Sequence, residues 1–173
     1  MRHVLVALVQ DEPGVLARMG NLFARRGYNV ESFTAGSSEV TGLTRVTIVV
    51  EGPSAALDQV AKQFRKLIGA VKVTDVTADR DQLAHEMLLV KVAVNARTRQ
   101  EVVNLADLFK ARIVDVSSTT LMLEATGEPD KVAKFLEVLR PFGIKEQART
   151  GVVSMSRGAK ILNQRPGGAS PAD

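Results

Sequence analysis

Hydrophobic positions at the start of the chain follow first a strand pattern and then a helix pattern. The run from Val4 to Val9 is apolar without polar alternation, so we expect both faces of this predicted strand to be buried. Pro13-Gly14 then opens a predicted helix, which Gly27 ends as a left-handed cap. Apolar residues recur at helical spacing between them, on one face: Val15, Leu16, Met19, Leu22 and Phe23.

The following residues complete a small unit. The pattern predicts a hairpin of strands over 29–36 and 43–50, joined by a turn rich in Gly, Ser and Glu. A helix over 53–68 and a strand over 71–76 come next. The order strand, helix, strand, strand, helix, strand is typical of a ferredoxin-like βαββαβ unit, in which two helices cover one face of a four-stranded antiparallel sheet.

The second half of the chain repeats this order. Asn21-Leu22-Phe23 corresponds in pattern to Asp107-Leu108-Phe109, and Gly52-Pro53 corresponds to Glu128-Pro129. Strands and helices of the second copy are predicted over 87–94, 99–109, 113–117, 120–125, 129–139 and 144–154.

We therefore expect an α+β protein of two tandem ferredoxin-like βαββαβ domains with antiparallel sheets. The predicted boundaries are 1–78 for the N-terminal domain, 79–85 for a polar linker, 86–155 for the C-terminal domain and 156–173 for a flexible tail. The first strand, apolar on both faces, needs a second cover. The simplest candidates are the sister copy or another chain, so we expect oligomerisation.

The composition removes several classes of chemistry. The sequence has no Cys, and its two histidines, His3 and His85, are isolated, which excludes thiol nucleophiles, zinc-thiolate sites and His-rich metal sites. Both imidazoles are expected at the surface. No P-loop, G-x-S-x-G elbow or H-E-x-x-H motif is present in the sequence. We expect no catalytic and no metal-binding residue on this chain, and no enzymatic role for the chain alone.

The net charge of +4 is spread thinly, and the basic pair Arg25-Arg26 is interpreted as a solvated helix face rather than a nucleic-acid surface. No run approaches the roughly 20 apolar residues that span a bilayer, and the N-terminus lacks the features of a signal peptide. We expect a cytoplasmic protein that binds neither nucleic acid nor membrane.

The segment Asp11-Glu12-Pro13-Gly14-Val15-Leu16 lies between a strand end and a helix start. A helix N-terminus offers unpaired N–H groups and a positive dipole end to a carboxylate, and Gly14 allows a ligand close to the backbone. Asn29, at the start of the next strand and expected near the same edge, could supply an amide. The alternative is that Asp11 merely caps the helix and Gly14 merely permits a tight turn.

The D-x-P-G-V-L loop and the order of elements resemble an ACT domain, a small-molecule sensing module that usually binds amino acids. Residues 1 to about 160 further resemble the small regulatory subunit of acetohydroxyacid synthase, also called acetolactate synthase. The segments that carry this resemblance are Glu12–Leu16, Leu22–Ser32, Thr44–Ile48, Glu86–Val92, Ile113–Val116 and Ala148–Val153. The runs R-R-G-Y-N-V-E-S and M-L-L-V-K-V are specific to this family.

The resemblance implies a non-catalytic subunit that activates a large catalytic subunit and confers feedback inhibition by valine or another branched-chain amino acid. Thiamine diphosphate, magnesium and FAD are expected on the catalytic partner and no cofactor on this chain. In the family two ACT domains pair edge to edge as a homodimer, with the inhibitor at that interface. Carried over by position, the residues that bind the effector are Asp11, Gly14 and Val15 at one end, and Asn29 with Val30 from the partner.

Two features qualify this assignment. The family commonly has Asn where this chain has Asp11, and a carboxylate cannot donate a hydrogen bond to a ligand carboxylate. The second copy has Asn95-Ala96-Arg97-Thr98 in place of the Pro13-Gly14 loop, so we expect it to be structural or dimerising. The alternative function is a free-standing tandem ACT sensor that controls transcription or another enzyme.

Overall fold

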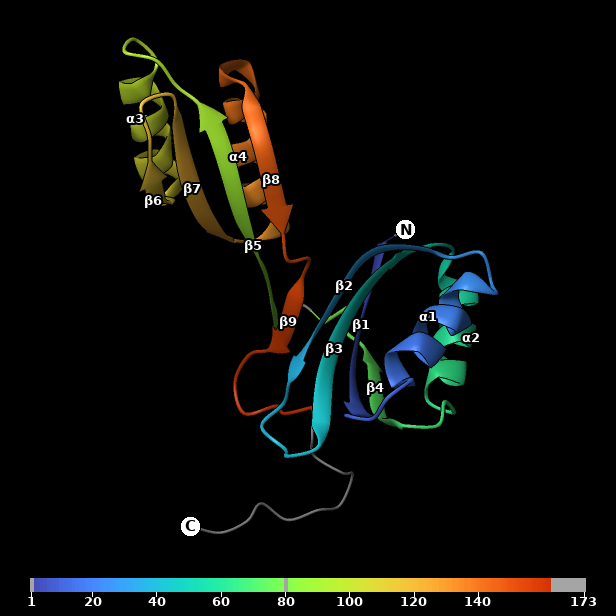
Figure 1. The fold of residues 1–173 in the computed structure, drawn as a ribbon. Helices are drawn as coiled ribbons and strands as arrows, with labels where there is room; N and C mark the ends of the chain where they lie inside the picture. Colours follow the sequence, from blue (N-terminus) through green and yellow to red (C-terminus); the bar gives the residue numbers. More distant parts are fainter. Residues whose placement is uncertain (1, 80, 163–173) are drawn as a thin grey trace, which may run out of the picture. The chain divides into compact units, whose positions relative to one another are not determined.

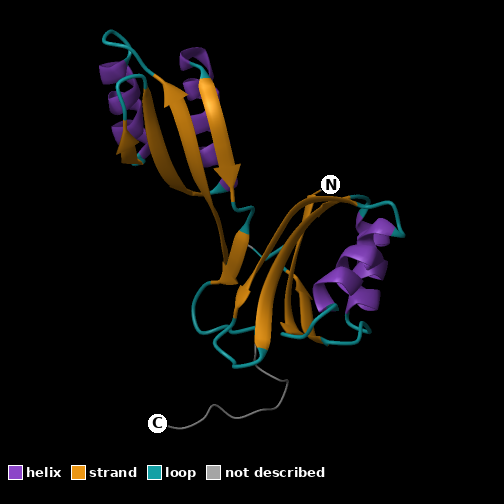
Figure 2. Cartoon of the chain, viewed as in Figure 1, coloured by secondary structure: helices purple, strands orange, loops and turns teal. Residues whose placement is uncertain are grey.

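The structure is a computed structural model that describes residues 2–79 and 81–162. The chain divides into two units, and each is described by itself. The first consists of Met1–Leu83 together with Ser154–Asp173, and the second of Ala84–Val153 (Figure 1). Both have the expected α+β organisation, with a pair of helices on one face of an antiparallel sheet (Figure 2).

The first unit has the βαββαβ order predicted from the sequence. Its sheet has the strand order β2-β3-β1-β4, with β1 paired to both β3 and β4. The elements are β1 (Arg2–Gln10), α1 (Val15–Ala24), β2 (Asn29–Ser37), β3 (Leu43–Glu51), α2 (Ser54–Phe64) and β4 (Ala70–Asp75). Helix α2 is shorter than the predicted 53–68, because the chain turns over residues 65–68 before β4.

Successive side chains of β1 point to opposite faces of the sheet, and both faces are buried. Leu5, Ala7 and Val9 belong to the core cluster that also contains the buried face of α1 and α2. Phe23 of α1 packs edge-on against Phe64 of α2, with ring centroids 6.1 Å apart. Since successive strand residues point to opposite faces, the other residues of β1 lie on the face away from the helices.

The second unit repeats this order from β5 (Gln82–Ala93) onward. The strand order is β6-β7-β5-β8, and β9 also pairs with β5. The further elements are α3 (Arg99–Phe109), β6 (Arg112–Val116), β7 (Thr120–Gly127), α4 (Pro129–Leu139), a 3₁₀ turn (Arg140–Phe142) and β8 (Ile144–Arg149). The last strand, β9 (Val153–Ser156), belongs to the first unit from Ser154 onward. Phe109 and Phe135 pack in its core with ring centroids 5.0 Å apart.

The predicted boundaries differ from the observed ones in three places. Strand β5 begins at Gln82, inside the predicted linker 79–85. The single strand expected over 144–154 is two strands, because Gly151 adopts a left-handed φ of 79° between them. Ser156, Gly158 and Lys160–Leu162 of the expected tail line a cavity on the first unit, and 163–173 lie outside the described residues.

The outer face of β1 is covered in part by its own chain. Val6 and Leu8 are each 1% exposed, and Val6 lines a cavity with Met155 and Ile161 from the C-terminal segment. We expected a sister copy or another chain to be the simplest cover. The expectation of a surface imidazole at His3 was wrong: His3 is buried, with its Nδ1 3.4 Å from Oδ2 of Asp75.

Candidate functional site

The loop after β1 is held by backbone hydrogen bonds on both sides. The Gln10 N–H donates to the Gly69 carbonyl at 2.7 Å, and the Asp11 N–H donates to the Gly42 carbonyl at 2.9 Å. The side chain of Asp11 is exposed. The loop therefore has a defined backbone while its carboxylate projects to the surface.

Gly14 is the N-cap of α1 and adopts a left-handed conformation with φ 85°. No side chain caps the helix, so the alternative in which Asp11 serves as the cap is wrong. By helix geometry the amides of Leu16 and Ala17 have no intrahelical acceptor, and the first turn contains no acidic residue. This helix start therefore keeps unpaired donors, and no acid in its first turn compensates the positive end of the dipole.

Arg18 adds a charge that the sequence analysis missed. A Cβ placed on Gly14 would lie 3.4 Å from Arg18 Nη1, and one placed on Gly69 would lie 3.7 Å from Arg18 Nη2. The guanidinium therefore lies beside both glycines. Its Nε is buried and has no hydrogen-bond partner among the described residues. The sequence does contain a signal for this position. Arg18 follows Gly14 by four residues, and residues four apart are neighbours on the surface of a helix.

Val15 contributes its backbone and not its side chain to this loop. The side chain is 1% exposed and packs in the core with Met19 and Phe23. Its N–H donates to the Glu12 carbonyl at 3.3 Å. A Cβ on Gly69 would lie only 2.9 Å from Val15 Cγ2, so Gly69 allows the valine and the β4 entry to pack closely.

Asn29 and Val30 lie at the opposite end of the same sheet. Asn29 pairs with Glu51 of β3, whereas Gln10, the residue before the loop, pairs with Leu43. From Leu43 to Glu51 is eight residues, or about 27 Å along the strand. The expectation that Asn29 lies near the same edge as the loop was wrong. Asn29 is exposed, and Val30 packs partly against the core.

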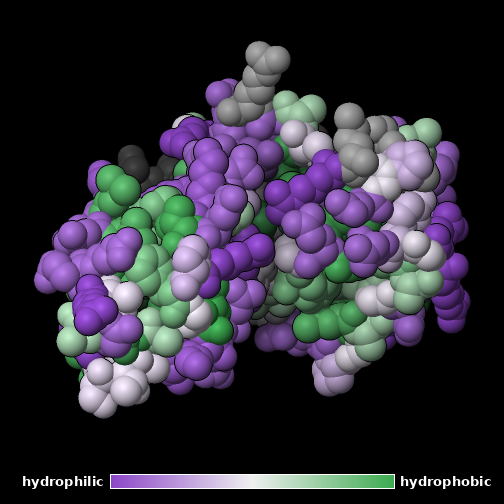
Figure 3. Space-filling model, turned by 90° about the horizontal axis from the view of Figure 1, so that it is seen from above, coloured by the Kyte–Doolittle hydropathy of each residue, from purple (hydrophilic) through white to green (hydrophobic). Residues whose placement is uncertain are grey.

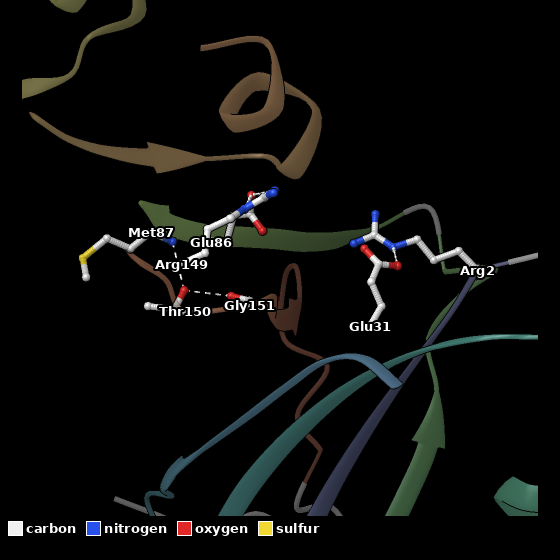
Figure 4. Close-up of polar contacts among 7 residues, drawn as sticks. All are labelled: Arg2, Glu31, Glu86, Met87, Arg149, Thr150 and Gly151. Carbon is white, nitrogen blue, oxygen red and sulfur yellow. Dashed lines mark hydrogen bonds and ion pairs between the residues drawn. The ribbon is translucent and has the colours of Figure 1, made fainter. Parts of the chain in front are cut away.

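Strand β2, which carries Asn29, is an edge of the first sheet. Its register with β3 shifts at Glu31, whose carboxylate forms an ion pair with Arg2 Nε at 2.9 Å (Figure 4). Hydrophobic side chains also reach the surface of the molecule (green in Figure 3). Phe33, in the middle of β2, is 39% exposed. An edge strand with an exposed aromatic residue offers both backbone and apolar surface to another strand.

The equivalent turn in the second unit is closed by its own side chains. The Asn95 Oδ1 accepts hydrogen bonds from the N–H groups of Arg97 and Thr98 at 2.9 and 3.0 Å, and Thr98 Oγ1 accepts from the Asn95 N–H at 3.0 Å. Glu101 in the first turn of α3 compensates the helix dipole. This turn therefore has little to offer an anionic ligand.

An ion pair with one buried partner joins β5 and β8 of the second unit. Arg149 Nε donates to Glu86 Oε1 at 2.9 Å, with a second contact from Arg149 Nη2 (Figure 4). Glu86 is 5% exposed. Next to this pair the Met87 N–H donates to Thr150 Oγ1 at 3.0 Å. The sequence predicted a strand that starts only at Met87, and no role was attached to Glu86 or Arg149 as a pair.

Residues 2–79 and 81–162 contain no group of three or more His, Cys, Asp or Glu side chains arranged to hold a metal ion. Within the same ranges, no helix is long and apolar enough to cross a membrane.

Comparison with known proteins identifies both halves. A family model described as "AHAS small subunit-like ACT domain" matches residues 5–72, and one described as "Small subunit of acetolactate synthase" matches residues 85–158. The probable acetolactate synthase small subunit of Archaeoglobus fulgidus is 47% identical over 160 residues, which cover 92% of this chain and 99% of that protein.

Two further relatives agree. The acetolactate synthase small subunit of Mycobacterium leprae is 47% identical over 158 residues, covering 91% of this chain and 93% of that protein. The crystal structure of the small subunit from Thermotoga maritima matches with a TM-score of 0.85 and 39% identity, over 91% of this chain and 98% of that chain. These findings confirm the expected fold, and the chain belongs to the acetolactate synthase small-subunit family, as a regulatory subunit with an ACT domain.

Proposed function

We propose that this chain pairs with the large catalytic subunit of acetolactate synthase, activates it, and confers feedback inhibition by binding a branched-chain amino acid, valine, between two ACT domains. In this proposal the chain is itself non-catalytic. The holoenzyme cofactors, thiamine diphosphate, magnesium and FAD, lie on the catalytic subunit. A cytoplasmic location stays a prediction.

The start of α1 suits the carboxylate of the effector. The unpaired amides of Leu16 and Ala17 and the guanidinium of Arg18 lie at a helix start whose first turn contains no acid. Charge-assisted hydrogen bonds from such donors are about twice as strong as neutral ones. Gly14 leaves this end uncovered, since it has no side chain. We assign the carboxylate of valine to this position.

The observation that carries the proposal is the strand register. Asn29 and the loop at Asp11 lie at opposite ends of the first sheet, so one chain alone cannot bring them to one ligand. If two copies pair antiparallel through their β2 edges, Asn29 of one copy lies opposite Ser37 of the other. Ser37 pairs with Thr44, which in turn pairs with Val9, just before the loop.

Such pairing makes the site a property of the dimer. Ser37 lies on β2, two strands from β1, or about 10 Å from the strand that carries the loop. A ligand of the size of an amino acid can contact both. Each antiparallel dimer would contain two equivalent sites, each with Asp11 and Gly14 from one copy and Asn29 and Val30 from the other.

Mixing two defective variants tests this arrangement. Gly14→Val and Asn29→Ala chains should each give a holoenzyme that is stimulated but not inhibited by valine. In a dimer of one chain of each variant, one site carries both substitutions and the other carries neither. Random pairing makes about half of the dimers mixed, so about one site in four should bind valine normally. The measurement is acetolactate formation by the catalytic subunit, with and without valine. Asn104→Ala, an exposed change in the second unit, is the matched control.

The outcomes separate the parts of the proposal. Failure of every form of the chain to stimulate the catalytic subunit would contradict the regulatory role and favour the free-standing sensor. Stimulation with normal valine inhibition in both single variants would remove the assigned residues from the site. Absence of restoration in the mixture would place each site within one chain.

Asp11 has a separate test. A carboxylate at this position repels the carboxylate of valine and attracts its ammonium group, whereas Asn offers a donor. Asp11→Asn should therefore change the affinity for valine. Identical calorimetric titrations of the two proteins would show that Asp11 does not contact the ligand.

A further inference from the structure

The outer face of the first sheet carries a cavity that is separate from the start of α1. Arg45 of β3 and Lys72 of β4 both pair with Leu8 of β1, so the two basic side chains flank Leu8 on the face away from the helices. Residues of the C-terminal segment between Ser154 and Leu162 line one side of a partly open cavity of about 210 Å³ over this face. None of the predicted effector residues lines it.

The covering segment is attached to the first unit by polar contacts along its length. These contacts are Arg45 Nη2 to the Ser154 carbonyl at 2.7 Å, Ser154 Oγ to Gln82 Oε1 at 2.7 Å, the Arg157 N–H to the Asp81 carbonyl at 2.7 Å, and Lys160 Nζ to Asp79 Oδ2 at 2.7 Å. The Lys160 contact lowers the pKa of Asp79. The cavity is therefore formed by folded chain on both sides.

Arg45, which lines this cavity, has one guanidinium donor without a partner. Its Nη2 donates to the Ser154 carbonyl, but its Nε is buried and has no hydrogen-bond partner among the described residues. Burial lowers the pKa of Arg45, and the charge of Glu39 opposes this. A buried donor without a partner is costly, and a carboxylate is the natural acceptor for a guanidinium.

The rest of the lining is largely apolar. Val6 and Val76 are nearly fully buried, and Met155, Ile161 and Leu162 close the cavity from the covering segment. The cationic groups that line it, Arg45, Lys72 and Lys160, outnumber the acidic one, Glu39. A cavity with apolar walls and an excess of positive charge fits an anion with a hydrocarbon tail.

We propose that this cavity binds a short aliphatic monocarboxylate, with its carboxylate beside the guanidinium of Arg45 and its tail against Val6, Val76 and Met155. The volume of about 210 Å³ is well above the roughly 10–15 Å³ that one water needs, so the cavity can take a ligand of several non-hydrogen atoms. Isovalerate, which has a carboxylate and a short branched tail, is the probe. The site does not depend on the proposed effector site, which uses other residues.

Titration of the full chain with isovalerate, followed by NMR chemical shifts or calorimetry, tests the assignment. For a ligand of this size we expect a dissociation constant on the order of 1 mM. Isovaleramide has the same shape without the charge, and acetate has the charge without the tail. Each should bind at least about tenfold more weakly, because each lacks one of the two interactions.

Two variants place the ligand in the cavity. Arg45→Gln removes the guanidinium and should weaken isovalerate binding at least about tenfold. Met155→Trp adds bulk from a residue that is 57% exposed, so the fold should tolerate it while the tail loses its place. Lys62→Gln, an exposed change on α2 at the other face of the sheet, is the matched control and should leave binding unchanged.

Circular dichroism and thermal unfolding establish that each variant is folded. Equal binding of isovaleramide, equal binding of acetate, or unchanged binding in both cavity variants would each overturn the proposal. So would the absence of any isovalerate binding to the wild-type chain. Valine binding that persists in Arg45→Gln while isovalerate binding is lost would show that the two sites are distinct.

Discussion

The two units share one fold but treat the polar groups at their first helix differently. Helix α1 begins at Gly14 without a side-chain cap and without an acid in its first turn, whereas α3 is preceded by a turn that Asn95 closes and carries Glu101 in its first turn. The same topology thus produces a helix start with unpaired donors in one unit and a self-satisfied helix start in the other.

The arginines near these helix starts extend the contrast. Arg99 of α3 donates through Nη2 to the carbonyls of Ser117 and Ser118, both at 2.8 Å. Arg18 of α1 keeps a buried Nε without a partner, and so does Arg45 on the outer face of the same unit. Across residues 2–79 and 81–162, the buried side-chain atoms left without a partner both belong to the first unit. Unsatisfied donors in the unit proposed to sense a ligand are what a binding role requires.

The largest change in stability is expected at the ion pairs. Here the more buried pair, Glu86–Arg149, belongs to the second unit, and the more exposed pair, Arg2–Glu31, belongs to the first. Arg149→Met leaves Glu86 buried and unpaired and should lower the free energy of unfolding by about 3 kcal/mol. Arg2→Met removes the partner of Glu31, in a pair that is 39% and 41% exposed, and should cost about 1 kcal/mol or less. Urea denaturation measures both. Equal losses would show that burial of the pair in the second unit has no energetic consequence.

The second prediction concerns the two arginines at the helix starts. Arg18→Met should weaken valine binding by about 1.5–3 kcal/mol, or about 10- to 150-fold, because a charged hydrogen bond to the ligand is lost. Arg99→Met should leave valine binding unchanged, since Arg99 already serves two carbonyls in the other unit. Calorimetry with valine measures both affinities. A loss in the Arg99 variant equal to that in the Arg18 variant would contradict the contrast.

A matched pair of glycine variants tests the backbone of the open end. Gly14→Ala should destabilise the chain by about 1–2 kcal/mol and weaken valine binding, because a left-handed φ of 85° is unfavourable for Ala. Gly20→Ala lies within α1, where an added Cβ meets nothing within 4 Å, and should stabilise by up to about 1 kcal/mol. Chemical denaturation measures the change in the free energy of unfolding for both variants. A Gly14→Ala variant more stable than the wild type would contradict the claim that the left-handed backbone at this position requires glycine.

The smallest effect is expected at the turn residues. Asn95→Ala removes the acceptor of two backbone N–H groups and should destabilise the chain by about 1 kcal/mol. Asp11→Ala, at the corresponding loop, should change the unfolding free energy by less than about 0.5 kcal/mol, because the exposed carboxylate caps nothing. If the Asp11 variant proves the less stable of the two, the loop of the first unit is held by its side chain.

Periodicity predicted the order of elements well, because helical and strand spacing are local properties of the chain. The failures have long-range causes. The strand expected over 144–154 is broken at Gly151, and β5 begins inside a segment that is polar enough to resemble a linker. The predicted position of Asn29, near the loop after β1, was wrong. The sequence shows where a strand starts but not which end of the sheet that start occupies.

The sequence by itself determined the repeated βαββαβ order, a first strand buried on both faces, the poverty of reactive side chains and the family to which the chain belongs. Only the tertiary structure decided that Arg18 lies beside Gly14 and Gly69, that Glu86 is buried against Arg149, and that the C-terminal segment covers the outer face of the first sheet. The physical reason is that spacing along the chain encodes each element, whereas register and chain crossings decide which distant charges meet.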